Sequence, residues 1–385
     1  MLRRNLRHER ARSDDHVHSR GLNRVGTGQD RRTGEAGGAG PNCHQGTGRC
    51  APKLARRKRP GASVSLWRAR RSGGLHFGWK VAFTRVYSER RRGQKAGADT
   101  LFNVASLSKP ITAEVLLRLA STGRLDLRRW RPTGSTRISR AIRAGSLTVK
   151  TALRHRTGLP NWRVHTGYVL SFVVEPGTTF RYSGEGYTYA ARYAERRTGQ
   201  SFEELAKRLF FAPLGMRNTS YTVQPTWKSR AAYPHDGQGR ELPPLLRLDF
   251  SGACCVHTTI GDYARFAATT MRGPALSPAI KEQRFAIARD QRNEMCGVDG
   301  IALAQCPPRM GMGLGWMLFG YPGETVVTHT GVNEGERSAV FLIPEHRTGL
   351  VVLTNGANGA KLIRDVTAAA YDNPSYLRLV EATAR

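Results

Sequence analysis

The chain has 385 residues, and its 61 lysine and arginine side chains against 29 aspartate and glutamate side chains give a formal net charge of +32 at pH 7. Its length allows one large domain or two smaller ones. No stretch approaches the roughly 20 apolar residues that a membrane-spanning helix needs, and no segment has the apolar run of a recognisable signal peptide.

Residues 1–75 form a basic arm with 18 basic and 5 acidic side chains, a net charge of +13 that leaves +19 for the remainder. The arm has no Phe or Tyr and a single tryptophan, Trp67. It therefore cannot bury enough apolar surface to offset the entropy of ordering, and we expect it to be disordered. Residues 128–146 are also rich in arginine and lack clear periodicity.

A basic arm of this kind can contact nucleic acid or an anionic membrane non-specifically, through release of counterions. A solvated tail is the simpler interpretation. The arm lacks the aromatic side chains on which single-stranded readers stack bases, and the sequence contains no helix-turn-helix or zinc finger. We therefore expect no specific nucleic-acid partner.

Residues 106–109, Ser-Leu-Ser-Lys, set a hydroxyl and an amine three positions apart at the start of a predicted amphipathic helix. Apolar residues follow at helical spacing, at Ile111, Val115, Leu116 and Leu119. Residues i and i+3 of a helix are neighbours, so the Lys109 amine can reach the Ser106 hydroxyl. The helix N-terminus adds positive potential where a tetrahedral oxyanion would form. This nucleophile with its base indicates acyl transfer. The alternative, a capping serine before a first-turn lysine, fits less well because lysine there opposes the helix dipole.

Two further groups of residues follow in the chain. Tyr182-Ser183 lies in a turn-rich loop before another predicted helix. His329-Thr330-Gly331 lies among β-branched runs bounded by Gly, Asn and Pro, which are typical of strands. A Tyr-Ser pair or a His-Thr-Gly run alone is usually an ordinary turn or strand end.

With these three boxes in this order, the chain resembles the serine β-lactamase and penicillin-binding superfamily, in its branch of class C β-lactamases, D-alanyl-D-alanine carboxypeptidases and esterases. The resemblance implies an α+β fold with an antiparallel sheet flanked by helices plus an all-helical lobe, over residues 76–385. Strands are expected near residues 80–87 and between 325 and 354, and a C-terminal helix over 360–371. A strand upstream of residue 80 is poorly supported.

The resemblance also implies the role of each residue. Ser106 would attack an acyl carbon, and Lys109 and Tyr182 would handle its proton. Free lysine titrates near ~10.4 and free tyrosine near ~10, so the pKa of one of them must be shifted, and the sequence leaves open which is the base. The oxyanion hole would consist of the backbone N–H groups of Ser106 and Val332. No cofactor or metal is implied, and the partner would be a small acyl substrate.

Two positions depart from the family pattern and bear on the substrate. The tyrosine box of β-lactamases and carboxypeptidases usually ends in asparagine, but Gly184 stands here, which favours esters over amides. His329, with Thr330 and Gly331 in the substrate-binding strand, stands where many members carry lysine and would be a weaker, pH-dependent anion partner. A true β-lactamase or carboxypeptidase, and a catalytically idle basic interaction protein on the same scaffold, remain alternatives.

Six cysteines allow 15 pairings, so the sequence does not define the disulfides. They are Cys43, Cys50, Cys254, Cys255, Cys296 and Cys306. Cys254, Cys255 and His257 are predicted to pack rather than to bind zinc, since no C-x-x-C pair is present. Members of the resembled family are often exported to the periplasm, but the sequence does not indicate this protein's location or oligomeric state.

Overall fold

The computed structural model describes residues 62–71, 77–129, 147–168, 170–296 and 301–383. At its centre is a seven-stranded sheet in which every neighbouring pair is antiparallel. In spatial order the strands are β2 (Phe77–Tyr87), β1 (Ala62–Arg71), β11 (Thr348–Thr354), β10 (Glu336–Ile343), β9 (Glu324–Asn333), β8 (Met317–Tyr321) and β7 (Arg309–Met312). Two small ladders pair β3 (Glu89–Arg91) with β4 (Gln94–Lys95) and β5 (Phe102–Asn103) with β6 (His257–Thr258).

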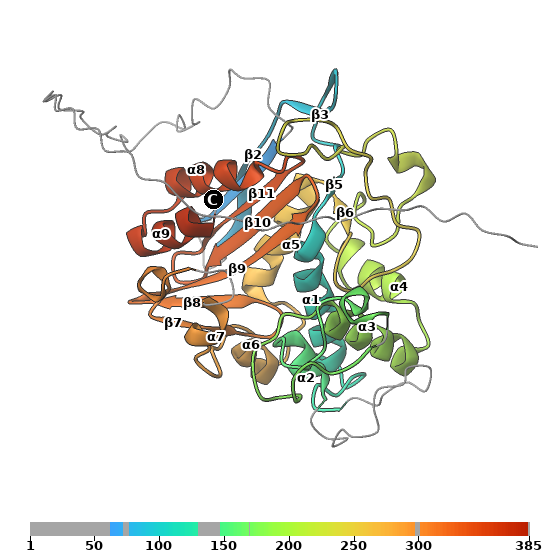
Figure 1. Ribbon diagram of the computed structural model, residues 1–385, viewed down its shortest axis with the longest axis vertical. Helices are drawn as coiled ribbons and strands as arrows, with labels where there is room; N and C mark the ends of the chain where they lie inside the picture. Colours follow the sequence, from blue (N-terminus) through green and yellow to red (C-terminus); the bar gives the residue numbers. More distant parts are fainter. Residues whose placement is uncertain (1–61, 72–76, 130–146, 169, 297–300, 384–385) are drawn as a thin grey trace, which may run out of the picture. The chain divides into compact units, whose positions relative to one another are not determined.

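Helices lie on both faces of the sheet and in a separate lobe (Figure 1). They are α1 (Ser108–Ser121), α2 (Val149–Leu153), α3 (Gly184–Thr198), α4 (Phe202–Ala206), α5 (Ile260–Arg272), α6 (Pro278–Arg284), α7 (Arg292–Cys296), α8 (Gly359–Ala370) and α9 (Pro374–Thr383). We call the sheet face against α5 the inner face and the face against α8 the outer face. The predicted α+β architecture is confirmed, with α8 within one residue of the predicted C-terminal helix.

The alternation of side chains along β10 divides the core in two. Val340 and Leu342 join the inner core with α1 and α5, whereas Phe341 and Ile343 join the outer core with α8 and α9. Successive residues of a strand point to opposite faces, so one apolar strand supplies both cores. None of the helices in the described parts of the chain has both the length and the apolar character that a membrane span requires.

Strand β1 lies within the predicted basic arm, so the prediction that all of residues 1–75 stand outside the fold is wrong. Residues Ala62–Arg68 of β1 pair with β11, and all of β1 pairs with β2 on its other side. Backbone hydrogen bonds to two neighbours stabilise a segment whose sequence is only weakly strand-like, because strand formation depends on tertiary context. We therefore include β1, from Ala62, in the folded domain. Residues 1–61 and 130–146 lie outside the described residues, and the predictions for them stay predictions.

Helix α1 is buried on all sides, which corrects the prediction of an amphipathic helix. Every residue from Ser108 to Leu119 is buried. Its polar side chains have partners, because Arg284 Nη1 donates to the two carboxylate oxygens of Glu114 at 3.0 and 3.2 Å. Arg118 lies 3.6 Å from the same carboxylate. The helix therefore occupies the middle of the molecule, and its first turn is held from several directions.

Candidate active site

The Ser106 hydroxyl and the Lys109 amine lie side by side at the start of α1. Ser106 belongs to a short 3-10 turn (Ala105–Leu107) that runs directly into α1. Lys109 Nζ lies 3.0 Å from Ser106 Oγ and donates to the backbone oxygen of Ala253 at 2.8 Å. The predicted i, i+3 contact is thus present, and it places an amine against the hydroxyl of Ser106.

The environment of Lys109 favours its neutral form. The side chain is fully buried, and its other close neighbours are the rings of Trp162, Tyr182 and Tyr187, whose centroids lie 5.8, 4.7 and 5.9 Å from Nζ. Burial lowers the pKa of the amine from 10.5 to about 7 because the charged form loses its hydration. At neutral pH a large fraction of Lys109 can therefore accept a proton.

Tyr182 stands against the same hydroxyl but keeps its proton. Burial raises the pKa of its phenol well above the ordinary value, and hydrogen bonding to Ser106 opposes this only in part. The ring stacks on His155 with centroids 4.2 Å apart. His155 Nδ1 accepts a hydrogen bond from the backbone N–H of Ser183 at 3.0 Å, which fixes both the imidazole and the tyrosine box. Tyr182 is thus suited to donate a proton rather than to accept one.

His329 points from the inner face of β9 toward this cluster. Its ring lies 6.3 Å from that of Tyr182, between centroids, and its Nδ1 lies 2.8 Å from the backbone oxygen of Thr330. Burial, and secondarily the nearby Lys109, lower the pKa of the imidazole to about 3. His329 is therefore neutral at neutral pH. This corrects the prediction of a pH-dependent anion partner in the physiological range.

Gly331 allows β9 to contact the turn that carries Ser106. A Cβ atom there would lie 2.4 Å from Val104 O and 2.2 Å from Ser338 Oγ, closer than real side chains approach. Ser338 Oγ also donates to Val104 O at 3.0 Å, which ties β10 to the same turn. Strand β8 pairs with β9 only as far as Thr328, so the backbone edge that continues to Val332 is not paired with β8.

A family model described as Beta-lactamase matches residues 48–373, most of the chain. The chain belongs to the Beta-lactamase family. Its similarity to the octameric penicillin-binding protein homologue from Pyrococcus abyssi has a TM-score of 0.63 at 21% identity, over 84% of this chain and 73% of the other. At that identity the likeness concerns the fold, which agrees with the described arrangement of sheet and helices.

The curated relatives of this Beta-lactamase family member differ in what they act on. The chain is 26% identical to Unguisins hydrolase ungD of Aspergillus violaceofuscus, over 68% of this chain and 53% of that protein, so it spans about half the length of that relative. It is 24% identical to D-alanyl-D-alanine-carboxypeptidase/endopeptidase AmpH of Escherichia coli, over 70% and 75% of the two chains. It is 28% identical to Esterase EstB of Burkholderia gladioli, over 50% and 55%.

Gly184 is covered by a tryptophan that the sequence did not single out. A Cβ atom at Gly184 would lie 2.7 and 2.8 Å from two ring carbons of Trp162. The Gly184 N–H donates to the side-chain and backbone oxygens of Asn161, both at 3.0 Å. In this Beta-lactamase family member an indole therefore occupies the space beside the tyrosine box. Trp162 ends the stretch LRHRTGLPNW, which precedes the tyrosine box in the sequence. This proximity in the sequence is the only signal that could have indicated a role for Trp162.

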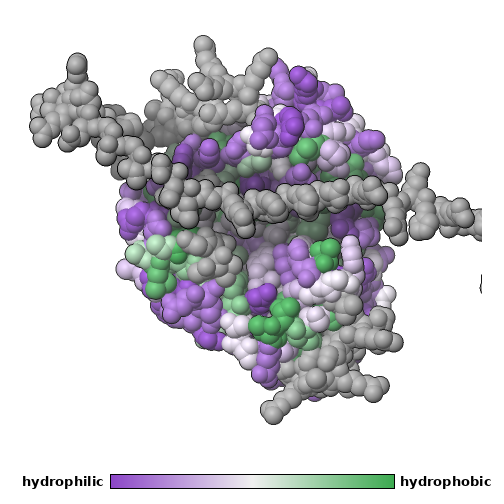
Figure 2. Space-filling model, viewed as in Figure 1, coloured by the Kyte–Doolittle hydropathy of each residue, from purple (hydrophilic) through white to green (hydrophobic). Residues whose placement is uncertain are grey.

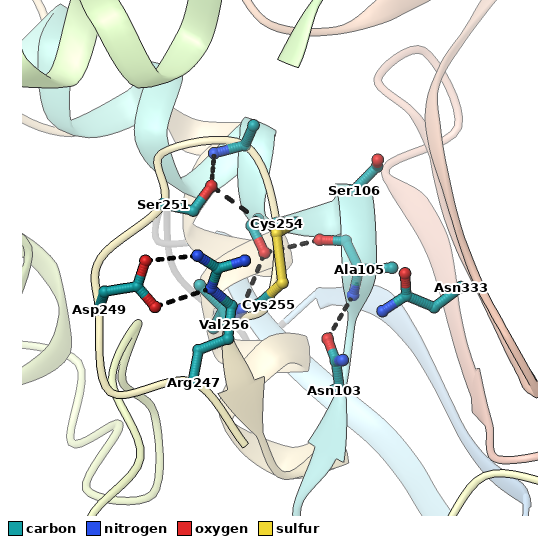
Figure 3. Close-up of a disulfide and its surroundings, with 12 residues drawn as sticks. Asn103, Ala105, Ser106, Arg247, Asp249, Ser251, Cys254, Cys255, Val256 and Asn333 are labelled. Atoms are coloured by element: carbon teal, nitrogen blue, oxygen red, sulfur yellow. Dashed lines mark hydrogen bonds and ion pairs between the residues drawn. A yellow bond between two sulfur atoms is a disulfide. The ribbon is translucent and has the colours of Figure 1, made fainter. Parts of the chain in front are cut away.

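The loop that holds Lys109 carries an unexpected disulfide between the adjacent residues Cys254 and Cys255 (Figure 3). The residue before this pair accepts the Lys109 hydrogen bond, and the residue after it, Val256, donates from its N–H to Ser108 Oγ at 3.0 Å. The sequence left the pairing of the cysteines open, and the structure joins these two by a covalent cross-link. Cys255 has a φ of 73°, a conformation that residues with a side chain rarely adopt.

A second disulfide joins Cys296 to Cys306, below the outer face of the sheet. The other two cysteines, Cys43 and Cys50, lie outside the described residues. Within the described ranges no group of three or more His, Cys, Asp or Glu side chains is arranged to hold a metal ion.

Proposed function

We propose that this protein is a serine hydrolase that forms an acyl-enzyme on Ser106 and acts preferentially on esters. The observation that carries the proposal is the buried Lys109 amine, 3.0 Å from Ser106 Oγ, with a pKa lowered to about 7. A base is most effective when its pKa lies near the working pH. An interaction protein without catalysis would have no need of a buried, neutral lysine at this position.

In the first step, Ser106 Oγ attacks the carbonyl carbon of the substrate while neutral Lys109 takes the hydroxyl proton. The carbonyl π electrons move to oxygen and give a tetrahedral oxyanion. The backbone N–H groups of Ser106 and Val332 would bind that oxyanion, supported by the start of α1 behind Ser106 and by the edge of β9 that does not pair with β8. Removing one such donor typically costs about 2.7–4 kcal/mol of transition-state stabilisation.

In the second step the bond to the leaving group breaks, and the Tyr182 hydroxyl donates a proton to the departing oxygen. Its raised pKa keeps that proton available at neutral pH. The proton on Lys109 then restores Tyr182, whose ring lies 4.7 Å from Nζ. Water attacks the acyl-enzyme with Lys109 again as base, and the acid leaves while Ser106 regains its proton. In this proposal Lys109 is the acylation base, a role that the sequence leaves open between Lys109 and Tyr182; the lowered pKa of the amine and the raised pKa of the phenol support that choice.

The preference for esters rests on the surroundings of Gly184. The asparagine amide that this position supplies in β-lactamases and carboxypeptidases would bind the amide group of a peptide or lactam. Here Trp162 takes up that space and presents apolar ring atoms. An amide substrate would therefore leave a polar group without a partner, which costs about 1–3 kcal/mol when the group is buried.

Covalent labelling tests the proposal. A fluorophosphonate probe should add a single label to the wild-type protein, at Ser106 by peptide mass spectrometry, and none to Ser106→Ala. Hydrolysis of p-nitrophenyl acetate should fall to background in the same variant. Ser121→Ala, at the other end of α1, is the matched control and should keep both the label and the activity. A wild-type protein that takes up no label and turns over no ester would leave the catalytically idle alternative.

A further inference from the structure

A cavity of about 710 Å³ lies beside the proposed catalytic residues, on the outer face of the sheet. One end is formed by Tyr182 together with Thr330 and Val332 of β9. The side chains of Thr330 and Val332 are exposed, and Val332 has 61% of its surface accessible. The cavity thus begins at the strand edge where the substrate would lie. Its size falls in the range of pockets that enclose small organic ligands, about 300–1,000 Å³.

The walls of this cavity are mostly apolar. Phe319 and Phe341 of the sheet form its floor, and Leu379 and Val380 of α9 lie on the other side. Among the described residues that line it, Arg337 alone carries a full charge, and its Nη1 donates to the backbone oxygens of Asn333 and Glu336 at 2.7 and 2.8 Å. Such a lining disfavours a charged or strongly hydrated occupant.

The apolar lining contrasts with the face of the molecule that Figure 2 shows. The face drawn in Figure 2 is largely hydrophilic, and its apolar side chains form small, separate patches. A mostly apolar cavity, lined at one end by Tyr182, differs in character from that face. Because burial of apolar surface is favourable, it selects substrates that bring an apolar group with them.

Tyr182 determines which part of the substrate would enter. It interacts with Ser106 and also lines the cavity, and in the proposed mechanism it protonates the leaving group. Lys109 is held toward Ala253, which is not among the residues that line the cavity. The leaving-group side of the scissile bond is thus the side on which the cavity opens.

We infer that this cavity binds an apolar alkyl or aryl group on the alcohol side of the ester. The inference rests on the proposed acyl-serine hydrolysis and names its substrate class: esters of apolar alcohols with small acyl groups. The products are the short acid and the apolar alcohol, with one water molecule consumed.

Two ester series test the inference. With acetate esters of ethanol, butanol, hexanol and octanol, kcat/KM should rise with chain length, by up to about fourfold for each buried methylene group. With ethyl esters of acetic, butyric and hexanoic acid, the rise should be clearly smaller. A dependence on the acid chain alone, or no dependence on the alcohol chain, would overturn the assignment.

Two alanines of α8 provide a matched pair of variants. Ala360 lines the cavity, whereas Ala369 is exposed on the same helix and does not line it. Ala360→Trp should lower kcat/KM for octyl acetate at least tenfold more than for ethyl acetate, and Ala369→Trp should leave the ratio of the two unchanged. If Ala360→Trp does not fold, Ala382→Trp fills the same cavity from α9. Equal ratios in a folded cavity variant and in the control would contradict the inference.

Binding of octan-1-ol separates this inference from the proposed function. Isothermal titration calorimetry should detect binding to Ser106→Ala and at least tenfold weaker binding to Ser106→Ala/Ala360→Trp. If no ester is hydrolysed but octanol binding follows this pattern, the cavity assignment stands and the hydrolase proposal fails. If esters are hydrolysed but octanol binds neither protein, the hydrolase proposal stands and the cavity assignment fails.

Discussion

The two faces of β9 show how one strand serves two purposes. On the inner face, His329 is fully buried and Gly331 lies against the turn that carries Ser106. On the outer face, Thr330 and Val332 are exposed beside a cavity. At Gly331 the inner face leaves no room for a single added carbon atom, while the outer face borders a cavity of about 710 Å³. Close packing holds the proposed reacting groups in place, and the open space is where the proposed substrate would enter.

The electrostatics of the inner face follow from the same close packing. Lys109, His155 and His329 are all fully buried, and burial lowers the pKa of each. The three basic groups lie near one another, and each positive charge would disfavour the others. The packed side of the site therefore shifts each of these groups toward its neutral form, which is the state that general-base catalysis requires.

The largest effect is expected from Gly331→Ala. Its Cβ would meet Val104 O and Ser338 Oγ, so β9 must move away from the Ser106 turn, and the two backbone N–H groups that we propose as oxyanion donors would separate. Loss of one donor is worth about 10²–10³ in kcat. Gly320→Ala on β8 is the control, because its Cβ has no contact closer than 3.4 Å. Steady-state kinetics with ethyl acetate would contradict the packing argument if both variants lost activity equally.

The pH dependence should report Lys109. Its amine accepts a proton only when neutral, so kcat/KM should fall about tenfold per unit as the pH drops below about 7 and level off above it. This acidic limb of the pH profile should persist in His329→Gln, because the pKa of His329 is about 3. In Lys109→Met, kcat should drop by at least ~10² and the limb should vanish. If the fall in kcat/KM at low pH disappeared in His329→Gln instead, Lys109 would not be the base.

A smaller effect, about tenfold in kcat/KM, is expected from substitutions at Gly184, the first residue of α3. Gly184→Asn alone should gain nothing for lactams, because Trp162 fills the space. Gly184→Asn/Trp162→Ala should raise kcat/KM for nitrocefin relative to p-nitrophenyl butyrate, since one hydrogen bond contributes about 0.5–1.5 kcal/mol. Trp162→Ala is the control. Efficient nitrocefin turnover by the wild-type protein would show that Gly184 does not set the substrate class.

Removing either disulfide should lower kcat less than the substitutions above, and removing the Cys254–Cys255 bond should lower it more than removing the Cys296–Cys306 bond. Without its cross-link, residue 255 is freed from a φ of 73°, so the loop that holds Lys109 can relax. We expect Cys254→Ala/Cys255→Ala to lower kcat for ethyl acetate about fivefold, which corresponds to roughly 1 kcal/mol in the barrier. Cys296→Ala/Cys306→Ala should have a smaller effect on kcat. The opposite order would mean that the outer core, not the inner loop, controls the catalytic geometry.

Several elements were predictable because their signals are local. The i, i+3 spacing of Ser106 and Lys109 is a property of any helical turn, and the observed distance of 3.0 Å agrees with it. The Ser-x-x-Glu spacing of Ser201 and Glu204 is itself the local pattern of a capping box, and that box is present at the start of α4. β1 was missed because its stability comes from pairing with β2 and β11 rather than from its own residues.

The three boxes and the resemblance that they carry were thus enough to predict the antiparallel α+β fold and the contact between the Ser106 hydroxyl and the Lys109 amine. The tertiary structure alone decided that Lys109 rests against Ala253, that Trp162 covers Gly184 and that an apolar cavity opens beside Tyr182. Lys109 and Ala253 are 144 positions apart. No local pattern encodes such a contact, because burial, and the pKa shifts that it causes, depend on which distant segments the folded chain brings together.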